Sequence, residues 1–231
     1  MLCCLAPDRQ AIRMPRESKA DLKKRTARLI SALSKLYPHA HTALRHSNPF
    51  QLLVATILSA QCTDVRVNIV TTELFKKYKT PADFAAASQK QLEAEIRSTG
   101  FFRNKAKNIR AASARIVQHF GGKTPDSMDP LLTLPGVARK TANVVLSGAF
   151  GKNDGVVVDT HVKRLAGRLA LSRQKTPEKI EQDLMELVPR KHWGSVSHML
   201  IYHGRAVCTA RKPDCPGCQI SKLCPSAFIE S

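Results

Sequence analysis

The stretch from Phe50 to Ala60 constrains the fold more than any other part of the chain, because it is apolar on almost every side. Its sequence, FQLLVATILSA, follows Asn48 and Pro49, a pair that is typical of a helix start. A helix without a polar face has to be surrounded by other elements. We therefore predict that this helix lies at the centre of a helical core.

The remaining chain reads as a series of short helices with start and stop signals of their own. Thr80 and Pro81 form a capping residue and a first-turn proline, and Gly121 ends a long basic helix. The strand-like run at 156–158 is too short to need a sheet, and we expect a buried connector there. The sequence therefore predicts an all-α fold. The longer expected helices cover residues 18–37, 50–60, 104–120, 140–150, 160–170, 177–188 and 192–207.

The charge of the chain indicates a polyanion as partner. Its 231 residues include 37 Lys and Arg against 18 Asp and Glu, a net charge of +19 that is spread over the helical segments. We expect nucleic acid, with a generally soluble basic surface as the alternative. No run of 18 apolar residues and no secretory signal is present. We therefore expect no membrane span and a cytoplasmic, nucleoid-associated monomer, with residues 1–17 as a disordered leader.

The stretch from Leu134 to Val145 reads as a helix–hairpin–helix. Pro135 and Gly136 make a tight turn, and a second, apolar helix follows with Lys140 in its first turns. The backbone N–H groups at such a helix start point outward, where a phosphate can bind. This pattern predicts a phosphate-binding site at the hairpin.

Four cysteines near the C-terminus have the spacing of a metal centre, C-x6-C-x2-C-x5-C. They are Cys208, Cys215, Cys218 and Cys224. The odd total of seven cysteines, without an export signal, argues against a disulfide framework. Zinc sites of four cysteines usually pair two short knuckles, and only Cys215 and Cys218 form one here. The longer gaps favour an iron–sulfur cubane, with zinc as the alternative.

The first gap of the cysteine pattern holds Arg211 and Lys212. A loop that is tied at both ends and carries two cations suits a phosphate backbone. The alternative is a solvated pair of charges on the surface. We predict a phosphate contact for both residues.

Lys140 and Asp159 indicate covalent chemistry on a sugar when they are considered together. A lysine amine is a useful nucleophile only when its ammonium form is disfavoured, by burial or by the positive end of a helix. A carboxylate beside a sugar C1′ stabilises oxocarbenium charge and accepts a proton, and the amine then traps C1′ as a Schiff base. Taken alone, Lys140 would be a phosphate or surface lysine and Asp159 a helix N-cap.

Several motifs stand in order along nearly the whole chain. They are LSAQ at 58–61 followed by Thr63 and Asp64, LPGVARKTANVV in the hairpin, VDTH at 158–161, HGR at 203–205 and the four-cysteine pattern. Together they resemble the endonuclease III family of bifunctional DNA glycosylase/AP lyases. The resemblance implies a base excision repair enzyme that removes oxidised or ring-saturated pyrimidines, flipped out of duplex DNA, and then cuts the abasic strand by β-elimination.

The resemblance also implies two all-α lobes with DNA in the cleft between them. Residues 42–152 would form a six-helix barrel lobe that bears the hairpin, and residues 18–41 with 153–231 would form a lobe closed by a [4Fe-4S] cluster on the four cysteines. Lys140 would form the Schiff base, and Asp159 would be the catalytic aspartate. The partner would be double-stranded DNA with damaged pyrimidines or abasic sites.

Particular DNA contacts follow from the same resemblance. Gln61 would fill the space left by the flipped base, and Phe101 stands where the family has a less bulky apolar wedge. Ala138 replaces the second glycine of the family hairpin. A left-handed backbone there would cost more with a Cβ present, but the N–H is still available, and we expect phosphate binding to survive. The hairpin contacts that we predict are Gly136, Ala138, Arg139 and Thr141.

Two other functions stay open at this point. A monofunctional adenine-excising glycosylase of the same superfamily shares the hairpin, the aspartate and the cluster, but it lacks the hairpin lysine. A non-catalytic helix–hairpin–helix DNA-binding protein would need neither Lys140 nor Asp159. The presence of both residues favours the bifunctional enzyme.

Overall fold

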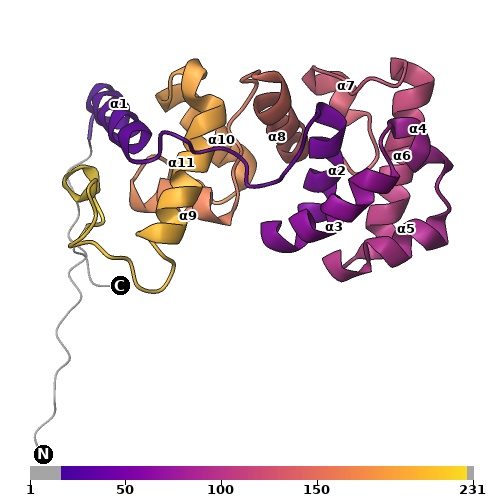
Figure 1. Cartoon of the computed structure of the whole chain (residues 1–231). Coiled ribbons are helices and arrows are strands. Elements are labelled where there is room, and N and C mark those ends of the chain that lie inside the picture. The colour runs from indigo at the N-terminus through magenta and orange to yellow at the C-terminus, as the bar shows by residue number, and fades with distance from the viewer. Residues whose placement is uncertain (1–16, 228–231) are drawn as a thin grey trace, which may run out of the picture.

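The structure, a computed structural model of the chain, describes residues 17–227. The leader predicted at residues 1–17 lies outside the described residues, except for Glu17. Within the described range the chain forms helices and no strand, which confirms the all-α prediction (Figure 1). None of these helices combines the length and the apolar character that a membrane crossing needs.

The α-helices of residues 17–227 are α1 (Lys19–Leu36), α2 (Pro49–Ser59), α3 (Asp64–Lys77), α4 (Pro81–Ala86), α5 (Gln89–Glu95), α6 (Phe102–Phe120), α7 (Met128–Leu132), α8 (Arg139–Phe150), α9 (Thr160–Arg168), α10 (Pro177–Leu187) and α11 (Trp193–Ala206). Short 3₁₀ helices are η1 (Arg97–Thr99), η2 (Arg190–His192) and η3 (Ser221–Leu223).

Several helices begin where a polar side chain caps the first turn. The side chains of Ser18, Asn48, Thr63, Thr80 and Ser88 each accept an N–H from the residue three positions further on. Each cap satisfies one of the backbone donors that a helix start leaves unpaired. The sequence therefore fixes these helix starts locally, close to the predicted positions.

Helix α2 lies inside the first of two hydrophobic cores, as its apolar sequence predicted. Leu52 and Leu58 have no exposed surface, and Leu53 is 1% exposed. Helices α3, α6 and α8 pack directly against it. Every side of α2 is thus covered by another part of the chain.

The second core joins the first helix to the end of the chain. Leu29, Ile30 and Leu33 of α1 are buried with Val156, Val158 and the inner faces of α9, α10 and α11. Figure 1 shows α1, α9, α10 and α11 at one end of the molecule, α2 to α7 at the other, and α8 between them. We keep the two-lobe division at residues 42–152 as a prediction, with these two clusters as the cores of its lobes.

The packing of α2, α6 and α8 places the end of α2 and the starts of α6 and α8 on the same side of the first core. The start of α2, the end of α6 and the end of α8 line one surface cavity. Because α2 packs against both α6 and α8, the opposite ends of these helices lie on the other side of the core. That other side carries Gln61 after α2, Phe101 before α6 and the hairpin before α8.

Phe84 is the aromatic centre of the first core, so its truncation should be costly. Its ring is fully buried, and its centroid lies 5.4 Å from that of Phe50 and 4.9 Å from that of Tyr78. We expect Phe84→Ala to lower the free energy of unfolding by about 3–5 kcal/mol, because a cavity adds to the lost burial. Urea denaturation measures this loss. A decrease below about 1 kcal/mol, the range of surface substitutions, would contradict the assigned core.

Candidate active site

The hairpin between α7 and α8 is a tight turn around Gly136. The Val137 N–H donates to the Leu134 carbonyl at 3.1 Å, and both flanking side chains are buried. Pro135 and Gly136 occupy the central positions, and Gly136 has φ +77°, the left-handed value of a type II turn. A Cβ on Gly136 would lie 2.8 Å from the Cβ of Asn108 in α6. The glycine is therefore required by the turn and by the packing of the hairpin on α6.

Ala138 does not have the left-handed backbone that would make a Cβ costly. It is the N-cap residue of α8, with φ −92° and ψ 169°, an extended conformation open to any residue. The cost does not arise because Gly136 alone closes the turn, and a residue that precedes a helix is normally extended. Alanine offers no acceptor, and no side chain caps the start of α8. The first N–H groups of α8 are thus left for an anion.

Lys140 lies in the first turn of α8 with an exposed side chain. The ion pair at this helix start is made by its neighbour Arg139, whose Nε and Nη2 lie 3.1–3.2 Å from the Glu181 carboxylate. The side chain is thus not buried, and it stands at the N-terminal end of α8, where the helix dipole is positive. The amine is placed to reach a ligand in front of the hairpin.

Glu181 was not among the predicted site residues, but it holds the hairpin helix to α10. It is 7% exposed and also accepts Nδ2 of Asn143 at 3.0 Å. A Cβ built on Gly155 would lie 2.1 Å from its Oε1, so a larger residue there would displace the Glu181 carboxylate. Arg139 and Asn143 flank the predicted nucleophile on α8. This contact therefore fixes the start of α8 against the segment that carries the predicted catalytic aspartate.

Asp159 is the N-cap of α9. Its Oδ1 accepts the N–H of Val162 at 2.8 Å, and the side chain is half-buried. The valines before it, residues 156–158, are at most 8% exposed and form the expected connector without a strand. The cap occupies one carboxylate oxygen and fixes the orientation of the other. The structural and the catalytic interpretation of this residue are thus compatible.

Helix α11 adds two side chains to this region that were given no role from the sequence. Nη2 of Arg205 lies 3.1 Å from Oδ2 of Asp64, and this ion pair joins α11 to the start of α3. Burial lowers the pKa of His198, as does the charge of His41, while the carboxylates of Asp159 and Asp64 oppose the shift. His198 and Arg205 are two turns apart on one helix, so the seven-residue spacing between His198 and the arginine of the HGR motif was the available signal.

Gln61 and Phe101 share a strained backbone. Gln61 has φ 53° and Phe101 has φ 47°, and the other non-glycine residue with positive φ between residues 17 and 227 is Ala170, with φ 50°. A left-handed conformation costs such residues about 1–2 kcal/mol. Both side chains are exposed, whereas Phe102 packs against the first core. The chain therefore turns Gln61 and Phe101 outward at the expense of backbone strain.

The four C-terminal cysteines line one cavity, with Arg168 and His203 beside them. Arg168 Nη1 lies 3.3 Å from Cys208 Sγ, and His203 Nε2 lies 3.6 Å from Cys218 Sγ. Burial raises the pKa of the Cys218 and Cys224 thiols. No three His, Cys, Asp or Glu side chains of residues 17–227 are grouped as around a single metal ion. The ligand set fits a sulfur-ligated centre, with a nitrogen of Arg168 and a ring nitrogen of His203 beside two of the sulfurs.

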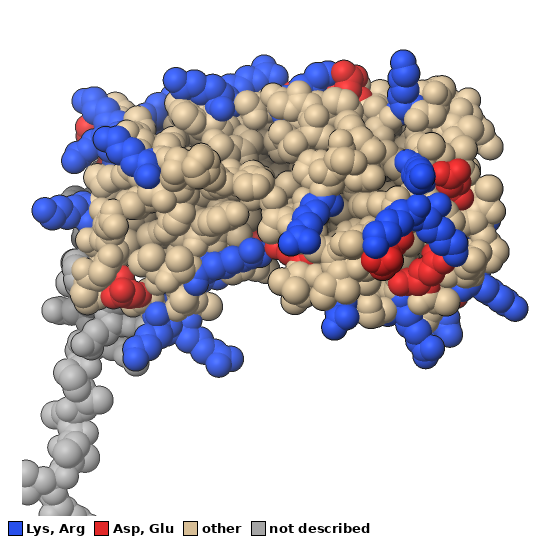
Figure 2. Space-filling view, viewed as in Figure 1, with Lys and Arg blue, Asp and Glu red and all other residues tan. Residues whose placement is uncertain are grey.

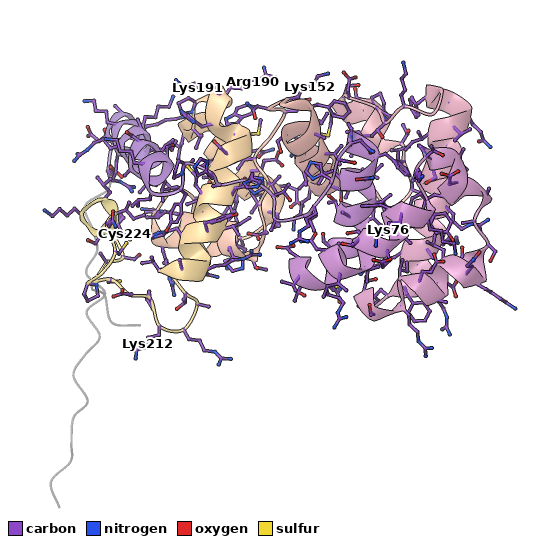
Figure 3. The ribbon with its side chains drawn as sticks, in the orientation of Figure 1. Lys76, Lys152, Arg190, Lys191, Lys212 and Cys224 are labelled. Carbon is purple, nitrogen blue, oxygen red and sulfur yellow. The ribbon has the colours of Figure 1, made fainter. Side chains whose placement is uncertain are left out.

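The loop after α11 presents Arg211 and Lys212 to solvent. Arg168 fixes its first part, because Nη1 donates to the Thr209 carbonyl at 2.6 Å and Nη2 to the Ala210 carbonyl at 2.8 Å. The Thr209 hydroxyl donates to the Lys212 carbonyl at 2.6 Å. Figure 3 shows Lys212 projecting from the lower side of the molecule. The two cations thus stand on a braced loop.

Basic side chains surround the molecule in the view of Figure 2, and acidic ones occupy few places. The lower edge is notched between the two groups of helices. Figure 3 places Lys152, just after α8, and Lys191, just before α11, on the upper side, opposite Lys212. The start of α8 and the end of α11 therefore point to the lower side, the side of the Lys212 loop.

Known proteins share both the sequence and the fold of this chain. Residues 54–190 match the family described as HhH-GPD superfamily base excision DNA repair protein. Endonuclease III of Synechocystis sp. is 56% identical over 208 residues, which cover 90% of this chain and 95% of that protein. Endonuclease III of Escherichia coli K12 is 39% identical over 202 residues, 87% of this chain and 95% of that protein.

Solved structures agree with these relatives. A non-covalent endonuclease III–DNA complex and a trapped endonuclease III–DNA covalent intermediate each superpose with a TM-score of 0.83 at 44% identity. Each comparison covers 89% of this chain and 96% of the other. The similarity thus extends over nearly the whole of both proteins.

The strain at Phe101 should be measurable by substitution with glycine. We expect Phe101→Gly to raise the free energy of unfolding by up to about 1 kcal/mol, because glycine adopts positive φ freely and the 63%-exposed ring contributes little packing. Activity on duplex DNA should fall at the same time, since the outward ring is lost. Urea denaturation and strand-cleavage rates measure the two effects.

Ala170→Gly is the matched control, because Ala170 has the same backbone strain outside the candidate site. It should stabilise the protein by a similar amount and leave activity unchanged. A Phe101→Gly variant that is both stable and fully active would show that the strained ring has no role with DNA.

Proposed function

This chain belongs to the endonuclease III family, and on that premise we propose how its own residues excise a damaged base and cut the DNA strand. The protein is a base excision repair DNA glycosylase/AP lyase. The proposed substrates are oxidised or ring-saturated pyrimidines and abasic sites in duplex DNA. The observation that carries the proposal is the exposed Lys140 amine in the uncapped first turn of α8. The covalent intermediate trapped for a related endonuclease III supports attack by an amine.

The DNA backbone is held at two places in this proposal. The open N–H groups at the start of α8 bind a phosphate beside Gly136, because the helix dipole favours an anion there. Arg211 and Lys212 bind a second part of the backbone from their braced loop. Arg139 is assigned to Glu181 instead, since its guanidinium is already paired with that carboxylate.

Gln61 and Phe101 open the duplex. Both project from turns on the side of the core that also carries the hairpin. Phe101 enters the base stack as an apolar wedge, and Gln61 occupies the space that the flipped nucleotide leaves. The damaged nucleotide then lies between the start of α8 and the start of α9.

Lys140 and Asp159 carry the chemistry. The bond between C1′ and the base breaks, and the base leaves with the bonding electrons and takes up a proton. Asp159 stabilises the positive charge at C1′ and accepts a proton from the Lys140 amine, whose nitrogen forms the new bond to C1′. Ring opening gives a Schiff base. Loss of a proton from C2′ then breaks the C3′–O bond and releases the 3′ phosphate.

We propose a [4Fe-4S] cluster on the four cysteines. The shared cavity, and the nitrogen atoms of Arg168 and His203 beside Cys208 and Cys218, support a sulfur-ligated centre. The single short knuckle, Cys215 to Cys218, favours the cubane over a structural zinc ion. When bound, the cluster would supply iron–thiolate bonds that hold both ends of the Arg211 loop, at Cys208 after α11 and at Cys215, to the segment of Cys218 and Cys224.

Borohydride trapping tests the assigned nucleophile. Reduction of the Schiff base should join the wild-type protein to DNA that contains thymine glycol or an abasic site. Lys140→Arg keeps a positive charge for DNA binding but has no amine that forms an imine, so we expect no trapped complex and a rate loss of at least about 10³-fold. Gel electrophoresis detects the complex, and a trapped product from Lys140→Arg would contradict the mechanism.

Iron content and visible absorption test the cluster. The wild-type protein should be yellow-brown and contain about four iron atoms per chain. We expect Cys215→Ala to lose both the colour and most of the iron, whereas Cys62→Ala, at a cysteine outside the pattern, should retain them. A colourless wild-type protein with one zinc ion per chain would exclude the cubane.

A further inference from the structure

Gln61 and Phe101 hold left-handed conformations that their side chains do not favour. Such strain persists only where the surroundings over-determine the backbone. Both side chains are exposed and contribute little packing of their own. The support for the two turns therefore has to come from residues beneath them.

The ammonium group of Lys105, in the first turn of α6, lies beneath both turns. The residue is only 5% exposed, and its Nζ donates to the Leu58 carbonyl at 2.8 Å and to the Thr99 carbonyl at 2.7 Å. Leu58 is in the last turn of α2, three positions before Gln61. Thr99 ends η1, two positions before Phe101. One amine thus binds a carbonyl at the C-terminal end of α2 and another at the end of η1, and the exposed residues Gln61 and Phe101 follow these two ends.

Both the lysine and the carbonyls gain from the contacts of Lys105 with Leu58 and Thr99. Carbonyls at the end of a helix lack an intrahelical partner, and a cation is favoured there. Lys105 satisfies two such carbonyls from different elements at once. Because its two acceptors are backbone atoms, the lysine sets the position of the two turns whatever side chains they carry.

A buried lysine is a costly means of joining two turns if stability alone were required. Burial lowers the pKa of Lys105, with the neighbouring Cys62 opposing the shift, and its hydrogen-bond acceptors are neutral carbonyls. An apolar side chain of similar length would fill the space without the desolvation of a charge. It would offer no N–H donor, however, and the two turns would lose their common anchor.

We propose that Lys105 is a positioning residue that holds Gln61 and Phe101 in one geometry for opening duplex DNA. This inference rests on the proposed function, because it takes these two residues as the ones that open the duplex. Lys105 contacts no DNA itself and acts through the backbone of the two turns. Its contribution is therefore needed only where a nucleotide has to be extruded from a stack.

The test compares cleavage of an abasic site in duplex DNA with cleavage of the same site in single-stranded DNA. We expect Lys105→Met to cut the duplex about tenfold more slowly, measured as kcat/KM, and the single strand within about twofold of wild type. Lys107→Met, at an exposed lysine of the same helix, is the control and should match wild type on both. Equal losses on both substrates, or no loss on the duplex, would overturn the proposal.

A double-mutant cycle separates positioning from a general weakening of the fold. In a protein that carries Gln61→Ala and Phe101→Ala, Lys105→Met should slow duplex cleavage by less than about twofold, because no wedge is left to position. The same tenfold loss in both backgrounds would overturn the proposal. Lys105→Arg keeps the N–H donors and should restore part of the duplex rate.

The failures of the two proposals are distinguishable. A wild-type protein that does not cleave single-stranded abasic DNA counts against the lyase function itself. A wild type that cleaves both substrates, with Lys105→Met rates unchanged, counts against the role of Lys105 alone.

If Lys105→Met does not fold, Lys105→Gln replaces it in these experiments. Glutamine keeps N–H donors on a shorter side chain that does not reach both carbonyls, and the expected rates are the same.

Discussion

The active site depends on one buried carboxylate, that of Glu181. It receives three contacts of 3.1–3.2 Å from Arg139 and one of 3.0 Å from Asn143, and it leaves no room for a side chain at residue 155. Breaking a buried ion pair costs about 3–5 kcal/mol because the remaining charge is unpaired, and the half-exposed Arg139 places this pair at the lower end. Lys140 lies between the two donors on α8. The relation between the nucleophile and the start of α9 therefore depends on this contact more than on either helix alone.

The helices differ in whether a side chain of the protein satisfies the free backbone N–H groups at their first turn. The starts of α1 to α5 and of α9 are capped by a polar side chain, whereas α6, α7, α8, α10 and α11 have no side-chain cap, and at α8 the N-cap residue is Ala138, which has no acceptor to offer. A cap at α8 would have stabilised the helix by about 1 kcal/mol and occupied a donor that a phosphate needs. Asp159 caps its own helix and still has a free oxygen, because Oδ1 accepts the Val162 N–H and Oδ2 is held beside it.

Much of the fold was predictable because its signals are local. The apolar sequence of α2 predicted a central helix, and residues such as Asn48 and Thr80 predicted helix starts within a few positions. The backbone at Ala138 was not readable from the family's glycine, because an extended residue suffices before the helix and only Gly136 of the turn has positive φ. Lys105 and Glu181 were missed for another reason. Their partners are distant in sequence, and neither periodicity nor spacing shows which carbonyl or carboxylate a buried polar side chain will meet.

The side of the molecule that faces DNA in our proposal concentrates features that lower the stability of the free protein. An uncapped helix start at Ala138, left-handed backbone at Gln61 and Phe101, and a buried ammonium at Lys105 each cost free energy. DNA offers what the first two lack, namely an acceptor for the open N–H groups and a base stack for the exposed ring. DNA binding then offsets part of the free energy that the uncapped helix start and the strained turns cost in the free protein. The stability of the protein and its affinity for DNA are therefore linked. The buried lysine differs from the other features, because it is fully satisfied before DNA arrives. It keeps the strained turns from relaxing in the free protein, so that the wedge is already formed at the first encounter with a duplex.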